Sequence, residues 1–267
     1  MSKNLHLVII DPQVDFCDPK GALSVAGADK DMERLATMVD RLAPKLTDIH
    51  VTLDSHHLIH VAHPIFWRDT SGKHPDIFTI ITASDVETGK WTPSLPSLTK
   101  RALAYVKALE KSGRYPLCIW PPHCLIGSPG HSVFPCLFEA LKRFEESQFA
   151  VVDFVTKGSN LYTEHYSAVR AEIVDPNDPS TQINTVLINT LMEADIIAIA
   201  GEAGSHCLAN TTRDIVSAFQ DDTYVQKIVL LEDATSPVTG FEQFQIDFIK
   251  EMTKRGMQLS KTTEFLV

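Results

Sequence analysis

Short apolar runs alternate along the chain with longer stretches in which apolar residues recur every three or four positions. The runs at 5–10 and 196–200 are nearly continuous in apolar residues, which is typical of strands buried on both faces of a parallel sheet, and residues 49–53 form a further predicted strand. Shorter runs at 117–120, 150–155 and 227–231 complete a set of six predicted strands. Helical patterns occupy most of the intervals, at 29–44, 98–112, 134–144, 184–193, from about Ser205 onward, and at 243–254.

The alternation of strands and helices predicts a doubly wound, parallel, six-stranded α/β sheet with helices on both faces. The length of 267 residues suits a single domain over residues 1–267. Residues 61–97 interrupt the alternation, because they are rich in Pro, Thr, Ser and Gly and carry little periodicity. We expect them to form an inserted lid over the site, and we expect the tail after the last helix to be irregular.

Composition narrows the class of protein. Hydrophobic residues make up 44% of the chain and charged residues 22%, which is enough apolar material for a large core. The formal net charge of −10 argues against binding to nucleic acid or to an anionic membrane, since both need a basic surface. No G-x-G-x-x-G or phosphate-loop motif follows a predicted strand, which excludes the usual nucleotide-binding interpretations. The sequence leaves open whether the chain forms a homo-oligomer.

The cysteines and the first residues indicate a cytoplasmic protein. The five cysteines are an odd number without a C-x-x-C pair, so they indicate neither a disulfide framework nor a structural zinc cluster. Reduced thiols are typical of the cytoplasm. The opening apolar run ends at Asp11 and is too short for a signal peptide or a membrane span.

Polar side chains gather where the predicted strands end, which is the edge at which open α/β sheets bind ligands. Asp11 follows the first strand, although Asp11 and Pro12 could simply turn the chain. Lys157 follows the fourth predicted strand, where it could also be a solvated end.

Histidines are concentrated after the second predicted strand. Asp54 is followed by four histidines within eight positions: His56, His57, His60 and His63. A lone histidine is usually a satisfied polar group, but a carboxylate with clustered imidazoles at a strand end favours a divalent metal. His123, after the third predicted strand, could complete a set with Asp54 and His56, and the adjacent Cys124 is either a further ligand or a buried filler.

Cys207 lies where a strand turns into a helix. The strand at 196–200 stops at Gly201, and the helical pattern starts near Ser205, so Cys207 falls in the first turn of the helix. Unpaired N–H groups and the helix dipole favour an anion there, and we expect the thiol to ionise more readily than a free one. The alternative is a small buried hydrophobic residue. A carboxylate, a lysine and a thiol at one sheet edge predict thiol-based acyl transfer.

Six motifs occur in one order along nearly the whole chain. They are D-x-Q-x-D-F at 11–16, D-x-H-x-x-x-H at 54–60, W-P-x-H-C at 120–124, K-G at 157–158, Y-S-A at 166–168 and G-x-A-x-x-H-C at 201–207. This set resembles the nicotinamidase and isochorismatase-like cysteine hydrolases. The resemblance implies the isochorismatase-like hydrolase fold and a catalytic triad of Asp11, Lys157 and Cys207.

The same resemblance assigns further residues around the triad. It implies an oxyanion hole formed by the backbone N–H groups of Ala203 and Cys207, and a cis peptide between Glu202 and Ala203. Phe16 and Trp120 match the aromatic walls that sandwich a flat substrate ring.

A metal ion is also implied by the resemblance. Asp54, His56 and His123 match the ligands that nicotinamidases keep, and His60 matches a further histidine near the metal in some members. Zinc is the first expectation for this ion, with iron and manganese as alternatives. In metal-bearing members the ion holds a pyridine nitrogen, directly or through water.

The expected reaction is hydrolysis of a small carboxamide through a thioester on Cys207, with nicotinamide to nicotinate and ammonia as the leading case. The alternatives are a related amidase acting on another small amide or carbamoyl compound, and a non-catalytic binding relative. Two departures bear on the substrate: the segment between the two metal motifs is longer than in compact nicotinamidases, and Glu202 stands where an apolar residue is commoner. Vinyl-ether hydrolysis of the isochorismatase kind does not call for a cysteine.

Overall fold

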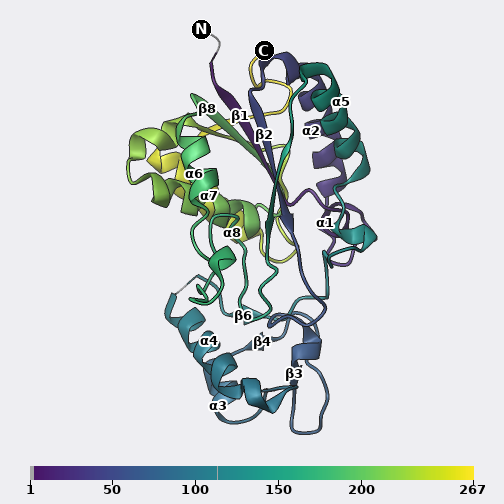
Figure 1. Ribbon diagram of the computed structural model, residues 1–267, viewed down its shortest axis with the longest axis vertical. Coiled ribbons are helices and arrows are strands. Elements are labelled where there is room, and N and C mark those ends of the chain that lie inside the picture. The colour runs from purple at the N-terminus through teal and green to yellow at the C-terminus, as the bar shows by residue number, and fades with distance from the viewer. Residues whose placement is uncertain (1–2, 113) are drawn as a thin grey trace.

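A parallel six-stranded sheet forms the centre of the molecule (Figure 1). The computed structural model describes residues 3–112 and 114–267. The strands lie in the order β10-β9-β8-β1-β2-β7, and every neighbouring pair is parallel. Their bounds are β1 Leu5–Ile10, β2 Asp48–Asp54, β7 Asp153–Lys157, β8 Ile196–Gly201, β9 Ile228–Leu231 and β10 Gln258–Ser260. The predicted fold class, a doubly wound parallel α/β sheet of six strands, is confirmed.

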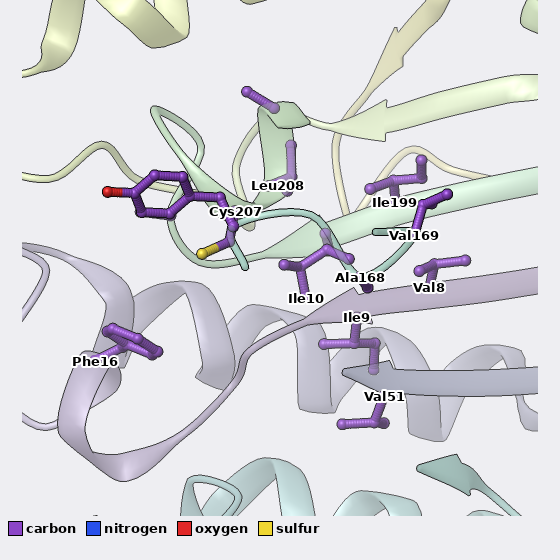
Figure 2. Packing of buried hydrophobic residues seen from close by; sticks show 14 of the residues in the cluster. Val8, Ile9, Ile10, Phe16, Val51, Ala168, Val169, Ile199, Cys207 and Leu208 are labelled. Carbon is purple, nitrogen blue, oxygen red and sulfur yellow. The ribbon is translucent and has the colours of Figure 1, made fainter. Parts of the chain in front are cut away.

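Helices cover both faces of the sheet (Figure 1). One face carries α1 Val14–Cys17, α2 Ala28–Leu42 and α5 Pro135–Gln148, and the other carries α6 Thr185–Met192, α7 Cys207–Phe219 and α8 Glu242–Arg255. The inner strands are apolar on both sides: all six residues of β1 are buried, and Val8, Ile9 and Ile10 pack beside Val51 and Ile199 (Figure 2). The continuous apolar runs therefore form the inner strands, as their pattern predicted.

A second group of short elements extends below the carboxyl ends of the strands (Figure 1). It contains β3 Trp67–Arg68, β4 Ile80–Ile81, α3 Ala83–Glu87, β5 Thr92–Pro93, α4 Thr99–Ser112 and β6 Leu117–Cys118. Two antiparallel pairs, β3 with β5 and β4 with β6, hold this group together. Short 3-10 helices occur at Ala43–Lys45, Pro64–Phe66, Pro96–Leu98, Pro129–His131, Pro179–Thr181 and Asp222–Lys227.

Two predictions about these elements are wrong, and a third element forms as predicted in an unexpected place. The run at 117–120 does not enter the main sheet, because its first two residues form β6 and pair with β4. The sixth strand of the sheet is β10 instead, in the tail that was expected to be irregular. The helix predicted at 98–112 matches α4, but it packs against α3, β5 and β6 rather than on the sheet. The excursion that begins near residue 61 therefore continues through α4 and β6.

No helix in the described ranges, 3–112 and 114–267, is long and apolar enough to cross a membrane.

Candidate active site

Four of the predicted residues meet at the carboxyl edge of the sheet because their strands are neighbours there. Asp11 directly follows β1, Asp54 ends β2, Lys157 ends β7, and Cys207 begins α7 after the turn from β8. The register of β2 and β7 places Asp54 opposite Lys157. Asp11 has a φ of 43°, in the left-handed region, and its carboxylate accepts a 2.5 Å hydrogen bond from the Thr52 hydroxyl of β2.

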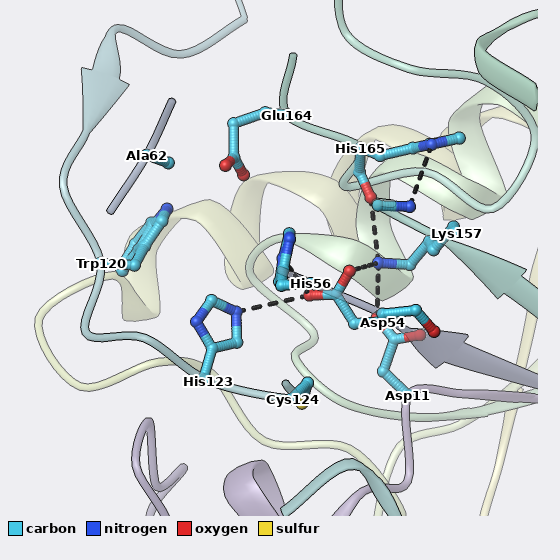
Figure 3. Close-up of polar contacts among 12 residues, drawn as sticks. Asp11, Asp54, His56, Ala62, Trp120, His123, Cys124, Lys157, Glu164 and His165 are labelled. Carbon is cyan, nitrogen blue, oxygen red and sulfur yellow. Dashed lines mark hydrogen bonds and ion pairs between the residues drawn. The ribbon is translucent and has the colours of Figure 1, made fainter. Parts of the chain in front are cut away.

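The ammonium of Lys157 is the centre of the site (Figure 3). Its Nζ lies 2.9 Å from Asp11 Oδ2, 3.1 Å from Asp54 Oδ1 and 3.7 Å from Cys207 Sγ, and it donates a 2.9 Å hydrogen bond to the His165 carbonyl. Burial would lower the pKa of Lys157, but the Asp11 and Asp54 carboxylates raise it well above its ordinary value. Lys157 is therefore a buried cation that links the three other groups.

The thiol of Cys207 does not ionise as readily as the sequence suggested. Burial raises its pKa well above the ordinary value of 9.0, and the Asp11 and Asp54 carboxylates raise it further, although Lys157 acts in the opposite direction. The prediction from the helix N-terminus omitted burial and the two carboxylates. Burial also raises the pKa of Asp11, against the attraction of Lys157. Cys207 therefore rests as a neutral thiol beside a carboxylate that can accept its proton.

The turn between β8 and α7 presents backbone N–H groups beside the thiol. The peptide between Glu202 and Ala203 is cis, as the resemblance implied. Within the described ranges, the N–H groups of Ala203 and Cys207 donate no hydrogen bond to another protein group. Ala203 and Cys207 both line the adjoining pocket. Two free donors near one sulfur can bind an oxygen that carries developing negative charge.

The pocket beside Cys207 has mostly apolar and aromatic walls with a few polar groups, as small-molecule sites do. Phe16 and Trp120, the predicted ring walls, both line it. Trp120 is fixed because its indole N–H donates a 3.0 Å hydrogen bond to Tyr166 of the Y-S-A motif. The other lining residues are Leu23, Asp54, His123, Glu164, His165, Tyr166, Ala203, His206, Cys207 and Val238.

Asp54, His56 and His123 come together as the sequence predicted, and all three are buried. His56 Nε2 and His123 Nε2 lie 3.0 and 3.4 Å from the same oxygen, Asp54 Oδ2 (Figure 3). His123 Nδ1 lies 2.8 Å from the Pro121 carbonyl. A hydrogen bond from a protonated Nδ1 to this carbonyl leaves Nε2 with a free electron pair. Burial lowers the pKa of His56 and favours the neutral imidazole. One carboxylate and two imidazoles fit a divalent metal ion.

The remaining histidines of the cluster differ in how their ring nitrogens are engaged. His60 is close to His56 and His63 rather than to Asp54 and His123. Its Nε2 lies 3.2 Å from the Thr163 carbonyl, and its Nδ1 accepts a 3.3 Å hydrogen bond from the Ala62 N–H.

Only one ring nitrogen of His63 has a hydrogen-bond partner among the described residues. Its Nδ1 lies 3.1 Å from the Leu58 carbonyl, whereas its buried Nε2 has no hydrogen-bond partner among the described residues. Its ring contacts those of both His56 and His123, with centroids 5.3 and 5.7 Å away. Burial lowers the pKa of His63 to about 3, so the ring is neutral. His57 is exposed.

Three polar residues of the pocket were not singled out from the sequence: Glu164, His165 and His206. Glu164 and His165 directly precede the Y-S-A motif, and His206 lies inside the last motif, so their places beside or within matched motifs were the available signal. Burial, with Asp54 as the next cause, raises the pKa of Glu164 to about 8. Burial lowers the pKa of His206 to about 4, and its ring stacks on Tyr115 with the centroids 5.1 Å apart.

The predicted lid borders this site without lining the pocket. No residue of 61–97 is among the lining residues in the described part of the chain. The excursion reaches the site through Trp120. The backbone N–H of Trp120 donates to the Ala62 carbonyl, and its ring meets the Phe78 ring edge-on, with the centroids 5.8 Å apart. It supports one wall of the pocket from behind.

Comparison with known proteins identifies the fold. No protein-family model matches the sequence, and no curated protein matches it by sequence. Solved structures match over nearly the whole chain. PnC1 from L. infantum, in complex with nicotinate, superposes with a TM-score of 0.61 at 20% identity, covering 98% of this chain and 95% of its own. The yeast nicotinamidase Pnc1p gives a TM-score of 0.64 at 18% identity, covering 96% of this chain and 98% of its own.

The chain has the nicotinamidase and isochorismatase-like fold. A pyrazinamidase of Pyrococcus horikoshii, solved in complex with zinc, shares this fold with a TM-score of 0.57 at 18% identity, covering 97% of this chain and 99% of its own. The fold expected from the six motifs is thus confirmed.

Proposed function

We propose that this chain is a metal-containing amidohydrolase that cleaves a small carboxamide through a thioester on Cys207, with nicotinamide as its leading substrate. The observation that carries the proposal is the placement of Lys157 Nζ, which lies 2.9 Å from Asp11 Oδ2 and 3.7 Å from Cys207 Sγ. Cys207 itself lines an aromatic pocket. Solved structures with this fold include PnC1 from L. infantum in complex with nicotinate and the yeast nicotinamidase Pnc1p bound to the inhibitor nicotinaldehyde.

The chemistry follows from the protonation states of the triad. Asp11 accepts the proton of the Cys207 thiol, and the sulfur attacks the amide carbon while Lys157 stabilises the anionic groups. The N–H groups of Ala203 and Cys207 bind the oxygen that becomes negative. Asp11 then gives its proton to the leaving nitrogen, and ammonia departs. Water, deprotonated by Asp11, hydrolyses the thioester and yields the carboxylic acid and the free thiol.

We include a divalent metal in the proposal because Asp54, His56 and His123 fit one. When bound, such an ion can hold a ring nitrogen of the substrate, directly or through water. Zinc is the first choice, with iron and manganese as alternatives, because ligand type alone does not separate them. Asp54 has a second task, since its Oδ1 contacts Lys157 while its Oδ2 faces the two imidazoles.

The walls of the pocket support a flat heteroaromatic amide over an aliphatic one. Phe16 and Trp120 line the same pocket as Asp54, His123 and Cys207, so one ring could meet aromatic surface, metal ligands and nucleophile together. An amidase for another small amide or carbamoyl compound would share the triad but would not need this combination. A non-catalytic binding relative would need neither Lys157 nor Cys207 beside Asp11.

The test is a comparison of nicotinamide with benzamide. Benzamide keeps the ring stacking and loses the ring nitrogen, so nicotinamide should have the higher kcat/KM by roughly a hundredfold or more, because the site holds a polar partner ready for that nitrogen. Removal of the metal with a chelator should narrow the gap. Ammonia release would be measured for both amides and for a set of aliphatic and carbamoyl compounds. A preference for an aliphatic amide would reject nicotinamide and leave the triad assignment standing.

A further inference from the structure

Glu202 is a fully buried carboxyl at the turn that carries the proposed oxyanion hole. It lies between Gly201, which ends β8, and Ala203, and its relative exposure is 0%. It takes no part in the triad or the metal cluster. A charged carboxylate is costly to bury without a partner, so its contacts need an explanation.

The two oxygens of Glu202 have different surroundings. Oε2 accepts a 3.1 Å hydrogen bond from the Ser236 N–H, whereas Oε1 receives none from the described residues. The Asp31 carboxyl of α2 lies within hydrogen-bonding reach of the Glu202 side chain. Burial raises the pKa of Glu202 well above its ordinary value, and the neighbouring Asp31 raises it further. A proton on Glu202 lets the two carboxyls share one hydrogen bond instead of repelling each other.

Ser236 belongs to a segment, 234–238, that is bonded to the turn 201–205 at every second residue. The Ala234 carbonyl accepts from Gly201 N–H at 2.8 Å, and the Ser236 carbonyl accepts from Gly204 N–H at 2.9 Å. The Val238 N–H donates to the Ser205 hydroxyl at 3.0 Å. We call residues 234–238 the clamp segment.

The clamp segment is also hydrogen-bonded to α2. The Ser236 hydroxyl donates a 2.6 Å hydrogen bond to Asp31 Oδ2, and Asp31 Oδ1 pairs with Arg34. Arg34 in turn donates to the Asp233 carbonyl at 2.6 Å, just before the clamp segment. Glu202 is therefore the only side chain of residues 201–203 that reaches both the clamp segment and α2.

We propose that Glu202 is a positioning residue, whose side chain holds the Ala203 and Cys207 N–H groups in place through Ser236 and Asp31. The inference rests on the proposed function, because it assigns a task within that oxyanion hole. Loss of the contact lets the turn shift, and small misplacement of catalytic donors costs rate rather than ground-state affinity.

The experiment compares Glu202→Gln with Glu202→Leu. Glutamine can accept from the Ser236 N–H and donate to Asp31, as a neutral carboxyl does, whereas leucine has similar bulk and can do neither. Glu202→Leu should lower kcat roughly tenfold to a hundredfold with KM changed less than about twofold, and Glu202→Gln should restore most of the loss. Binding of 3-pyridinecarboxaldehyde, whose thiol adduct places an oxyanion in the hole, should weaken in the leucine variant much more than binding of nicotinate.

Controls separate positioning from general destabilisation. Leu141→Ala, in the buried face of α5, should lower the melting temperature while leaving the ratio of aldehyde to nicotinate affinity unchanged. If Glu202→Leu does not fold, Ser236→Ala, which removes the hydroxyl bond to Asp31, should show the same kcat effect in weaker form. Equal kcat in the leucine and glutamine variants, or equal loss of aldehyde and nicotinate binding, would overturn the inference. A wild-type chain without amidase activity would instead reject the proposed function.

Discussion

Lys157 is the residue on which the electrostatics of the site depend. Its side chain is 1% exposed and separates two buried carboxylates, Asp11 and Asp54, that would otherwise face each other with like charge. Burying three ionised groups is favourable only when they neutralise one another with good geometry. The sequence showed Lys157 as one polar residue after a strand, and only the pairing of β7 with β2 shows its partners.

Lys157→Met should therefore destabilise the fold as well as remove activity. The change leaves the Asp11 and Asp54 carboxylates buried without their cation, at a cost of about 3–5 kcal/mol at neutral pH. The loss should shrink as the pH is lowered, because the carboxylates can then take up protons. Denaturant unfolding at several pH values measures this. Combining Lys157→Met with Asp11→Asn should recover part of the stability, and a fully additive loss would contradict the coupling.

The acid side of the pH–rate profile reports on Asp11. Burial raises its pKa above the ordinary value of 3.8, and the carboxyl must be ionised to accept the thiol proton. The value of kcat/KM should therefore fall as the pH drops through a pKa above that of an ordinary carboxyl. A rate that holds constant down to the ordinary carboxyl range would show that Asp11 is not the base.

The loop from Asp54 to His63 is the element that supplies the candidate metal ligands. Spacing along this loop predicted a histidine cluster, but it could not show which ring nitrogens are engaged by backbone groups. The structure shows that both nitrogens of His60 have backbone partners within 3.3 Å, while His63 keeps a buried and unpartnered Nε2. His63 is therefore the better placed of the two for support of the metal, and the prediction of His60 remains untested.

Metal affinity should distinguish these histidines. His63→Ala should weaken binding of Zn²⁺ or Co²⁺ roughly tenfold, and His60→Ala should weaken it less. His57→Ala is the matched control, since His57 belongs to the same loop and is exposed. Titration followed by calorimetry, and by the visible spectrum of the cobalt form, gives the affinities. A larger loss of metal affinity in His60→Ala than in His63→Ala would show that His60 is the histidine that supports the metal.

Elements were predictable from sequence where burial and periodicity agreed. β1, β8 and β9 are nearly continuous apolar runs, and they form, together with β2, where they were expected. The run at 117–120 is equally apolar, but the pattern reports burial and not the partner, and β6 is buried in the excursion. β10 was missed because its three residues are exposed or half-buried, as an edge strand allows.

At the scale of the whole molecule, the order of the strands explains why residues so distant in sequence form one site. β1 lies between β2 and β8, and β7 follows β2, so the ends of four neighbouring strands face one pocket. The sequence predicted this meeting because Asp11, Asp54, Lys157 and Cys207 each follow a predicted strand. They could not predict the ionisation of Cys207 or the contacts of Glu202, since both depend on burial by segments far along the chain.

The measurement that tests the central claim most directly is mass spectrometry of the protein quenched during turnover of nicotinamide, or of a slower pyridine carboxamide, followed by peptide mapping. The account predicts an acyl group on Cys207, absent from Cys207→Ala, which should keep its fold and lose ammonia release. Cys17 and Cys124 are internal controls, because both are buried and neither lines the pocket. An acyl group on either of them, or ammonia release that persists in Cys207→Ala, would contradict the account.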